Sequence, residues 1–286
     1  MRRRAPLALA LVTLAAAAPH AGAASGDAGA AARAAAWLTA NSGGAPAGQQ
    51  ADAVVALRAA GRSAAALRGR VNALARVAPA YAVTAGGAAK VAMAAVAARR
   101  DPARLGGVDY LKRITARYAG GRYGATAYDQ AFSLLALRAA GRTPPGSAVR
   151  ATLSARGGGG WDFALSGGRD SVDATALVIE ALAAVGVPAS DPGVRAAVRW
   201  MLAQRNRAGG LASAGGGGAT DANSTAGAIR ALRALGRTPP VSMRAALRGL
   251  QDPDGGIRST RASAGSRLLA TNDALVALAG KTLPVR

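Results

Sequence analysis

The sequence predicts an all-α protein built from repeated pairs of helices. Hydrophobic residues make up 51% of the 286-residue chain, and most of them are alanine, the strongest helix former. Runs of β-branched residues, which favour strands, are scarce. The strings ALRAAGR at 56–62 and 136–142 and ALRALGR at 231–237 are nearly identical. One structural unit therefore recurs along the chain, and its core is made of closely packed helices.

Six units are expected after the N-terminal segment, each with an outer and an inner helix. They cover residues 31–61, 64–99, 108–141, 156–186, 198–236 and 247–280. Leu57, Leu137, Leu182, Leu232 and Leu278 hold like positions, with separations of 80, 45, 50 and 46 residues. The first separation contains the second unit, which is degenerate. A period of about 40–50 residues with two helices per unit is typical of helical repeat proteins.

The outer helices are expected to be amphipathic. In the fifth unit Val194, Val198 and Leu202 share one face, and Arg195 and Arg199 lie between them. A glycine-rich turn follows, because glycine permits positive φ and close approach of the backbone.

The inner helices are expected to be buried, because residues 177–185 are apolar almost all round. A glycine ends four of them, with an arginine in the last turn in three cases to oppose the helix dipole. These glycines are Gly61, Gly141, Gly186 and Gly236. Twelve helices, alternately buried and half-exposed, favour two concentric rings closed into a barrel. An open superhelix is the structural alternative.

Residues 1–23 have the pattern of a secretory signal peptide. A basic start at 2–4 precedes an apolar run at 7–18 and small residues at 21–23. An uncleaved anchor is the alternative. We therefore expect a secreted or envelope-associated protein with one domain at 24–286. No later apolar run reaches membrane-spanning length without charges or glycines.

The composition excludes several kinds of site. The chain has no cysteine, and its single histidine, His20, lies in the predicted signal peptide. Disulfides, thiolate nucleophiles and Cys/His metal sites are therefore excluded, and we predict neither a metal nor a cofactor. The net charge of +22 favours an anionic envelope surface or a protein partner. Nucleic acid is a less favoured partner, because aromatic residues are not interleaved with the arginines.

Three stretches resemble a known family. WMLAQRNRAGGL at 200–211 and LRGLQDPDGGI at 247–257 are similar to the repeats of terpenoid cyclases and protein prenyltransferase β subunits. GGGGW at 157–161, followed by DSVDATALVIEAL at 170–182, looks like the second half of such a prenyltransferase and squalene oxidase repeat. The resemblance covers about 30–280 and implies an α/α toroid of about six helical hairpins.

The family's chemistries are only partly compatible with this chain. Class II terpene cyclases use the middle acid of an Asp-x-Asp-Asp-Thr-Ala motif, and the matching stretch at 171–176 keeps only Asp173. That residue has no acidic neighbour in sequence to keep it protonated. The zinc of the prenyltransferases needs Cys and His ligands, and a thioester needs cysteine, so both are excluded. A carbohydrate-active enzyme would need paired carboxylates, for which Asp162, Asp170 and Asp173 are candidates.

Several of these residues also have a structural interpretation. Asp129, Asp173 and Asn223 are placed to be N-caps of inner helices. The residues that follow Gly-Gly, which are Trp161, Leu211 and Ile257, are expected to pack between units, and Trp37 and Trp200 to wedge between neighbouring helices. Glu180, the only glutamate, is expected either to pair with an arginine or to face the centre.

We favour a non-catalytic toroid that binds a small apolar or isoprenoid-like ligand, or an envelope or protein partner. Its ligand site would lie where the inner helices begin, and it would consist of Trp161, Asp170, Asp173, Asp221 and Asn223. The alternative is a terpene-cyclase-like enzyme with Asp173 as general acid. A third possibility, an interaction module, predicts no central cavity.

Overall fold

The structure, a computed structural model, describes residues 21–285, and within them it is all-α. The predicted all-α class is thereby confirmed, with twelve helices and no strand in this part of the chain. The predicted signal peptide lies outside the described residues except for 21–23, and it stays a prediction. The helices are α1 (Ala21–Asn41), α2 (Ala47–Ala59), α3 (Ala64–Tyr81), α4 (Ala85–Ala97), α5 (Tyr110–Thr115), α6 (Ala127–Ala139), α7 (Gly146–Ser154), α8 (Val172–Ala184), α9 (Pro192–Ala203), α10 (Ala222–Ala234), α11 (Val241–Arg248) and α12 (Arg267–Leu278).

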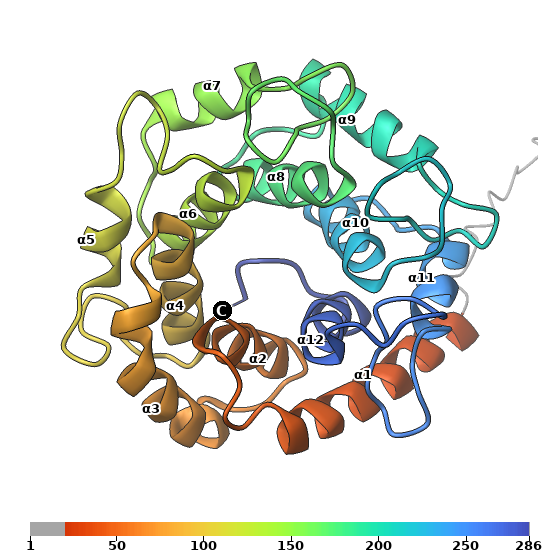
Figure 1. The fold of residues 1–286 in the computed structure, drawn as a ribbon, viewed down its shortest axis with the longest axis horizontal. Helices are drawn as coiled ribbons and strands as arrows, with labels where there is room; N and C mark the ends of the chain where they lie inside the picture. The colour runs from red at the N-terminus through yellow and green to blue at the C-terminus, as the bar shows by residue number, and fades with distance from the viewer. Residues whose placement is uncertain (1–20, 286) are drawn as a thin grey trace, which may run out of the picture.

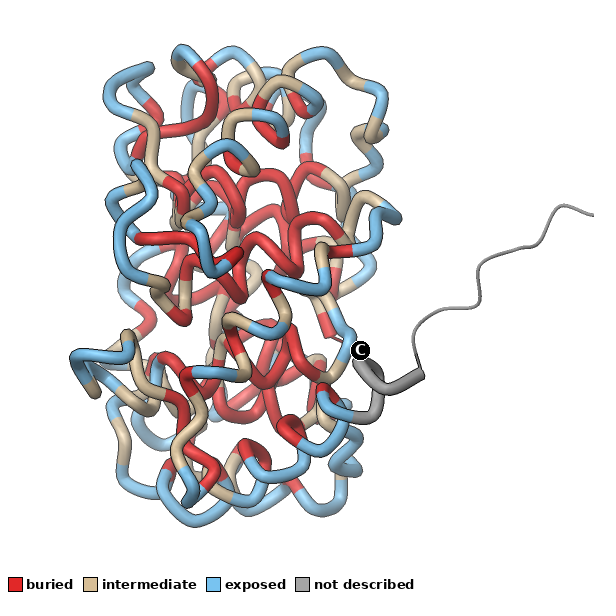
Figure 2. The backbone as a smooth tube through the Cα atoms, turned by 90° about the vertical axis from the view of Figure 1, so that its right-hand side faces the viewer, coloured by how far each residue is buried: buried red, intermediate tan, exposed pale blue. Residues whose placement is uncertain are grey.

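The even-numbered helices lie inside and the odd-numbered helices lie outside (Figure 1). Each of α2, α4, α6, α8 and α10 packs against the next even-numbered helix, and α12 packs against α2. Buried backbone accordingly runs through the interior, while exposed backbone lies at the periphery (Figure 2). The inner helices are rich in alanine, and small side chains allow their backbones to approach closely.

The glycine-rich turns lie against the outer helix of the following unit. A Cβ atom at Gly159 would come within 2.1 Å of Trp200 on α9, and one at Gly209 within 2.6 Å of Ser242 on α11. The turn before α12 makes the same contact with the first outer helix, because a Cβ atom at Gly255 would lie 2.6 Å from the Arg33 carbonyl on α1. These turns require glycine because backbone and neighbouring helix leave no room for a side chain.

The three residues that were expected to pack between units after a Gly-Gly pair are buried, as predicted. Trp161, Leu211 and Ile257 are fully buried. The backbone N–H of each donates to a threonine hydroxyl fourteen residues later in the inner helix, at 2.8–3.0 Å. The acceptors are Thr175, Thr225 and Thr271. The sequence analysis did not predict this bond, which satisfies a buried donor in each turn.

The predicted N-caps of three inner helices were wrong, because the actual caps lie two or three residues earlier in the chain. The side chain of Ser171 caps α8 by accepting from the Ala174 N–H, and Asp221 caps α10 by accepting from the Ser224 N–H. Thr126 likewise caps α6. Asp129, Asp173 and Asn223 therefore lie inside the first turn, where their side chains are available for other contacts. The predicted terminal glycines are correct, since Gly61, Gly141, Gly186 and Gly236 have φ values of 70–92°.

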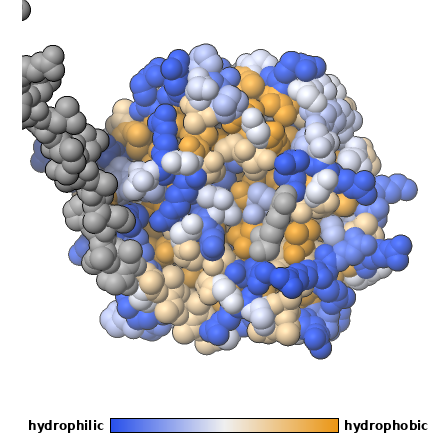
Figure 3. Space-filling view, turned by 180° about the vertical axis from the view of Figure 1, so that it is seen from behind, coloured by the Kyte–Doolittle hydropathy of each residue, from blue (hydrophilic) through white to orange (hydrophobic). Residues whose placement is uncertain are grey.

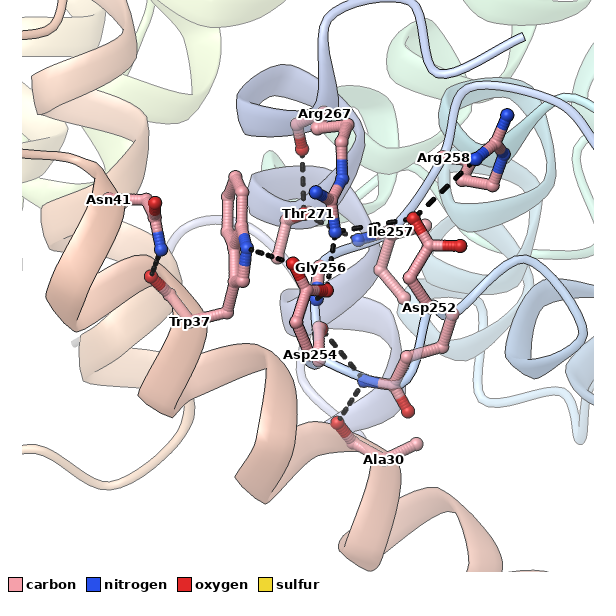
Figure 4. A network of polar contacts seen from close by, with 12 residues as sticks. Ala30, Trp37, Asn41, Asp252, Asp254, Gly256, Ile257, Arg258, Arg267 and Thr271 are labelled. Carbon is pink, nitrogen blue, oxygen red and sulfur yellow. Dashed lines mark hydrogen bonds and ion pairs between the residues drawn. The ribbon is translucent and has the colours of Figure 1, made fainter.

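Polar contacts join α1 to the last unit of the described chain. Trp37 Nε1 donates to Asp254 Oδ2 at 3.2 Å, and the same carboxylate pairs with Arg267, whose guanidinium lies over the Trp37 ring (Figure 4). On the preceding turns of α1, Asp27 forms ion pairs with Arg244 and Arg248 of α11. Residues more than 200 positions apart are thus held together.

We expect Asp27→Asn to destabilise the protein, because it removes the charge that two arginines share. The Asp27 side chain is only 7% exposed, while those of Arg244 and Arg248 are 15% and 25% exposed. The free energy of unfolding should fall by about 2 kcal/mol in urea denaturation. Asp101→Asn is the matched control, because Asp101 is exposed and pairs only with Arg104 three residues away. Equal effects of the two substitutions would contradict this role for Asp27.

Candidate functional site

A pocket of about 430 Å³ lies among the inner helices. It extends from the first turns of α8 and α10 to Leu283, in the segment after α12. All six inner helices contribute to its wall. The lining residues are Asp52, Val55, Lys90, Met93, Tyr128, Phe132, Asp173, Leu177, Ser213, Asp221, Asn223, Gly227, Arg230, Leu269, Asn272, Asp273, Val276 and Leu283.

The lining residues follow one register on every inner helix. Positions i, i+4 and i+7 lie on one face of a helix. On α10 these are Asn223, Gly227 and Arg230, and on α12 they are Leu269, Asp273 and Val276. Each of the other inner helices contributes two wall residues, at two of these three positions. They are Asp52 and Val55 on α2, Lys90 and Met93 on α4, Tyr128 and Phe132 on α6, and Asp173 and Leu177 on α8. In the fourth unit the recurring leucine, Leu182, lies five residues after the wall residue Leu177. The equivalent position in the second unit, five residues after Lys90, is Ala95. The second unit therefore lacks the leucine that identifies the other units in the sequence.

Three of the five predicted ligand residues line the pocket, namely Asp173, Asp221 and Asn223. Trp161 does not, because its ring is fully buried and its Nε1 donates to the Thr152 carbonyl at 2.7 Å. Asp170 also lies away from it, since its Oδ2 accepts from the Gly159 N–H at 2.7 Å and so holds the glycine turn. Both residues precede the inner helix and contribute to packing of the turn.

Asp162, the third candidate for the paired carboxylates of a carbohydrate-active enzyme beside Asp170 and Asp173, is likewise not part of the pocket. Its carboxylate accepts from the backbone N–H groups of Ser166 and Gly168 and from the Ser166 hydroxyl. Burial alone would raise the pKa of Asp162, but these hydrogen bonds lower it below its ordinary value. Asp162 is therefore an ionised acceptor that organises its loop, and the structure does not bring it together with Asp173.

The two cations that line the pocket, one half-buried and one buried, are already paired. Lys90 Nζ lies 2.6 Å from Asp52 Oδ2. Arg230 Nε lies 3.2 Å from Glu180 Oε2, and its Nη1 lies 3.2 Å from Asp273 Oδ1. The expected pairing of Glu180 with an arginine is thus confirmed. The other four residues of these pairs were not predicted from the sequence, although the i, i+4, i+7 register places each of them on the inward face. They are Asp52, Lys90, Arg230 and Asp273.

The Arg230 network also includes the segment after α12. Glu180 Oε1 accepts from the Leu283 N–H at 2.7 Å, and Asn223 Nδ2 donates to Asp273 Oδ2 at 2.7 Å. Burial lowers the pKa of Arg230, but Glu180 and Asp273 outweigh that effect and raise it. The guanidinium is therefore a permanent charge that links α8, α10 and α12.

Asp173 has a different environment. Its Oδ1 accepts from the Ser224 hydroxyl at 2.6 Å, and no cation among residues 21–285 forms an ion pair with it. Burial raises the pKa of Asp173 to about 6, and the nearby carboxylates of Asp221 and Asp273 add to the effect. The inference from the sequence that Asp173 lacks a like-charge environment was therefore wrong, because the fold brings acidic neighbours to it from the N-cap of α10 and from α12.

Aromatic side chains gather at α6, the inner helix that packs against α8. The rings of Tyr128 and Phe132 are 6.0 Å apart, and those of Tyr128 and Phe163 are 5.4 Å apart. Phe132 and Phe163 are the two phenylalanines of the chain. Phe163 is 58% exposed, so the three rings run from the interior to the surface. The low aromatic content thus conceals a local concentration beside the pocket.

No protein-family model matches the chain, and a comparison with curated proteins finds none that is similar to it. Within residues 21–285, no helix is both long and apolar enough to cross a membrane. The same part of the chain contains no group of three or more Asp, Glu, His or Cys side chains arranged to hold a metal ion.

We expect Asp173→Asn to change how stability depends on pH. Because burial raises the pKa of Asp173 in the folded state from 3.8 to about 6, the folded protein retains this proton longer than the unfolded chain does. Stability from this group is therefore lost as pH rises from about 4 through 6. Relative to the wild type, the variant should gain about 2 kcal/mol in free energy of unfolding between pH 4 and pH 7, measured in urea.

Two controls separate this effect from others. Asp101→Asn removes an exposed charge and should leave the pH profile unchanged. Ser171→Ala removes the cap of α8 and should cost about 1 kcal/mol at both pH values. Parallel wild-type and Asp173→Asn profiles would show that Asp173 titrates normally.

Proposed function

We propose that this protein is a six-repeat α/α toroid that binds a small molecule in its central pocket. The packing of each inner helix on the next, and of α12 on α2, supports the toroid. So does the turn at Gly255, which contacts α1 as other turns contact the helix of the next unit. We also propose that residues 1–23 direct secretion, as their pattern suggests.

The pocket is the observation that carries the binding proposal. Its volume of about 430 Å³ is in the range of small-molecule sites, which is about 300–1,000 Å³. Apolar side chains, such as Val55, Met93 and Leu177, share the wall with a few polar groups. A pure interaction module predicts a filled centre, so the cavity favours a ligand over that alternative.

The outer surface supports a second, separate contact. Of the basic residues that the structure describes, only Lys90 and Arg230 line the pocket. Hydrophilic side chains project between apolar areas on the face seen in Figure 3. A net charge of +22 on such a surface favours attachment to an anionic envelope, which salt would weaken.

Acid catalysis of the terpene-cyclase type is the second candidate. The observation that favours it is the raised pKa of about 6 at Asp173, because an acid of that pKa keeps its proton in mildly acidic solution, where it can act as a general acid. Phe132 and Tyr128 would face a carbocation. Turnover of squalene that Asp173→Asn abolishes would establish this candidate, and turnover that survives the substitution would exclude Asp173 as the acid.

The binding proposal predicts that a molecule copurifies with the protein and that filling the pocket removes it. Residues 24–286 would be purified from a secreting host and studied by native mass spectrometry, together with analysis of an organic-solvent extract. Val55→Phe adds bulk to the pocket wall, and Val77→Phe makes the same change at an exposed position of α3. We expect a stoichiometric ligand in the wild type and in Val77→Phe, and its loss in Val55→Phe. A ligand retained in Val55→Phe, or no ligand in any of the three proteins, would contradict central binding.

A further inference from the structure

The charge of the pocket is opposite to that of the protein. Among residues 21–285, four acidic side chains line it, against two basic ones. The four acids are Asp52, Asp173, Asp221 and Asp273. Since both cations are engaged by carboxylates in ion pairs, the lining carries excess negative charge.

Asp173 and Asp221 are the two lining acids that do not take part in the ion pairs of Lys90 and Arg230. Among the described residues, no ion pair includes either of them. Both lie within hydrogen-bond distance of the Ser224 hydroxyl, at 2.6 and 3.2 Å, and Asp221 Oδ1 also accepts from the Ser224 backbone N–H as the N-cap of α10, so these donors to the two carboxylates are neutral. A charge in a partly dehydrated site is costly unless an opposite charge approaches it. These two acids are therefore poised for a cation that the described chain does not provide.

A second observation independently points to a ligand with hydrogen-bond donors. Asn272 lies in the pocket wall and is only 2% exposed. Its Nδ2 donates to the Gln49 carbonyl at 3.3 Å, which fixes the amide, but its Oδ1 has no hydrogen-bond partner. An unpaired buried acceptor destabilises a folded protein, because it has lost its hydrogen bonds to water. A donor on a bound molecule would satisfy it.

The rest of the wall suits the body of such a molecule. Leu177, Val276 and Leu283 provide apolar surface, and Tyr128 and Phe132 provide aromatic rings. Aromatic faces attract organic cations, as well as burying apolar groups. Lys90 already lies 5.6 Å from the centre of the Phe132 ring, so this wall accommodates a cationic nitrogen in the protein itself.

We infer that the pocket binds a primary ammonium ion carrying an apolar group, an inference that rests on the proposed small-molecule function. The positive charge of the ligand would neutralise the charge of Asp173 and Asp221. Its N–H groups supply donors of the kind that Asn272 Oδ1 lacks. Its apolar group lies against the aliphatic and aromatic wall. An anion is disfavoured because it would face four carboxylates. A neutral ligand would leave the two acids uncompensated.

Four probes of matched size test this inference by isothermal titration calorimetry on residues 24–286 at pH 7.5. Hexylammonium has charge and N–H donors, hexyltrimethylammonium has charge alone, 1-hexanol is neutral, and hexanoate is an anion. We expect hexylammonium to bind about tenfold more tightly than hexyltrimethylammonium and hexanol, and hexanoate not to bind.

Variants assign the effect to named groups. Asp173→Asn should weaken hexylammonium about tenfold while leaving hexanol unchanged. Asn272→Leu should abolish the preference for hexylammonium over hexyltrimethylammonium, and it remains informative if Asp173→Asn does not fold. The control Asp101→Asn removes the same charge far from the pocket lining and should change nothing.

Equal binding of hexanol and hexylammonium, or binding of hexanoate, overturns the ammonium inference and leaves the pocket proposal intact. Failure of all four probes also overturns it. The copurification experiment is independent of these probes, so it decides separately whether the pocket binds a small molecule at all.

Discussion

The structure depends most on one buried guanidinium. Arg230 lies between Glu180 of α8 and Asp273 of α12, and its side chain is only 7% exposed. Glu180 in turn accepts from the Leu283 N–H, so the segment after α12 is fixed at the end of the pocket. Arranging helices around a centre leaves a space that alanine side chains are too small to fill. This ion network occupies part of that space and closes it at one end, and the pocket is what remains.

Small residues make this arrangement possible and also limit it. Alanine lets the inner helices approach each other, and glycine lets each turn contact a neighbouring outer helix, as Gly159 does at Trp200. The core therefore contains few large side chains, and specific polar bonds take over part of their role. The threonine hydroxyls that accept from the N–H groups of Trp161, Leu211 and Ile257 are of this kind. The ion pairs of Asp27 with α11 and of Asp254 with the start of α12 are also specific polar contacts of this kind, and they lie where α1 meets the last unit.

The helices could be predicted from the sequence because their signals are local. Apolar periodicity, glycine after the last turn and arginine within it depend on residues a few positions apart, as at Arg138 and Gly141. The pocket could be predicted only in part. Asp173, Asp221 and Asn223 stood out at helix starts, whereas Asp52, Lys90 and Asp273 needed the inward register of helices far apart in the chain. Asp173 was judged isolated because its acidic neighbours are about 50 residues or more away in sequence.

A double-mutant cycle on Arg230 and Glu180 tests the central claim most directly. Arg230→Met leaves Glu180 buried without its cation, and it should lower the free energy of unfolding by about 3–5 kcal/mol. Adding Glu180→Gln removes the uncompensated charge and should restore part of that loss, so that the double variant is more stable than the sum of the two single effects predicts. Strictly additive effects, or an Arg230→Met protein as stable as the wild type, would show that this network does not hold the centre together.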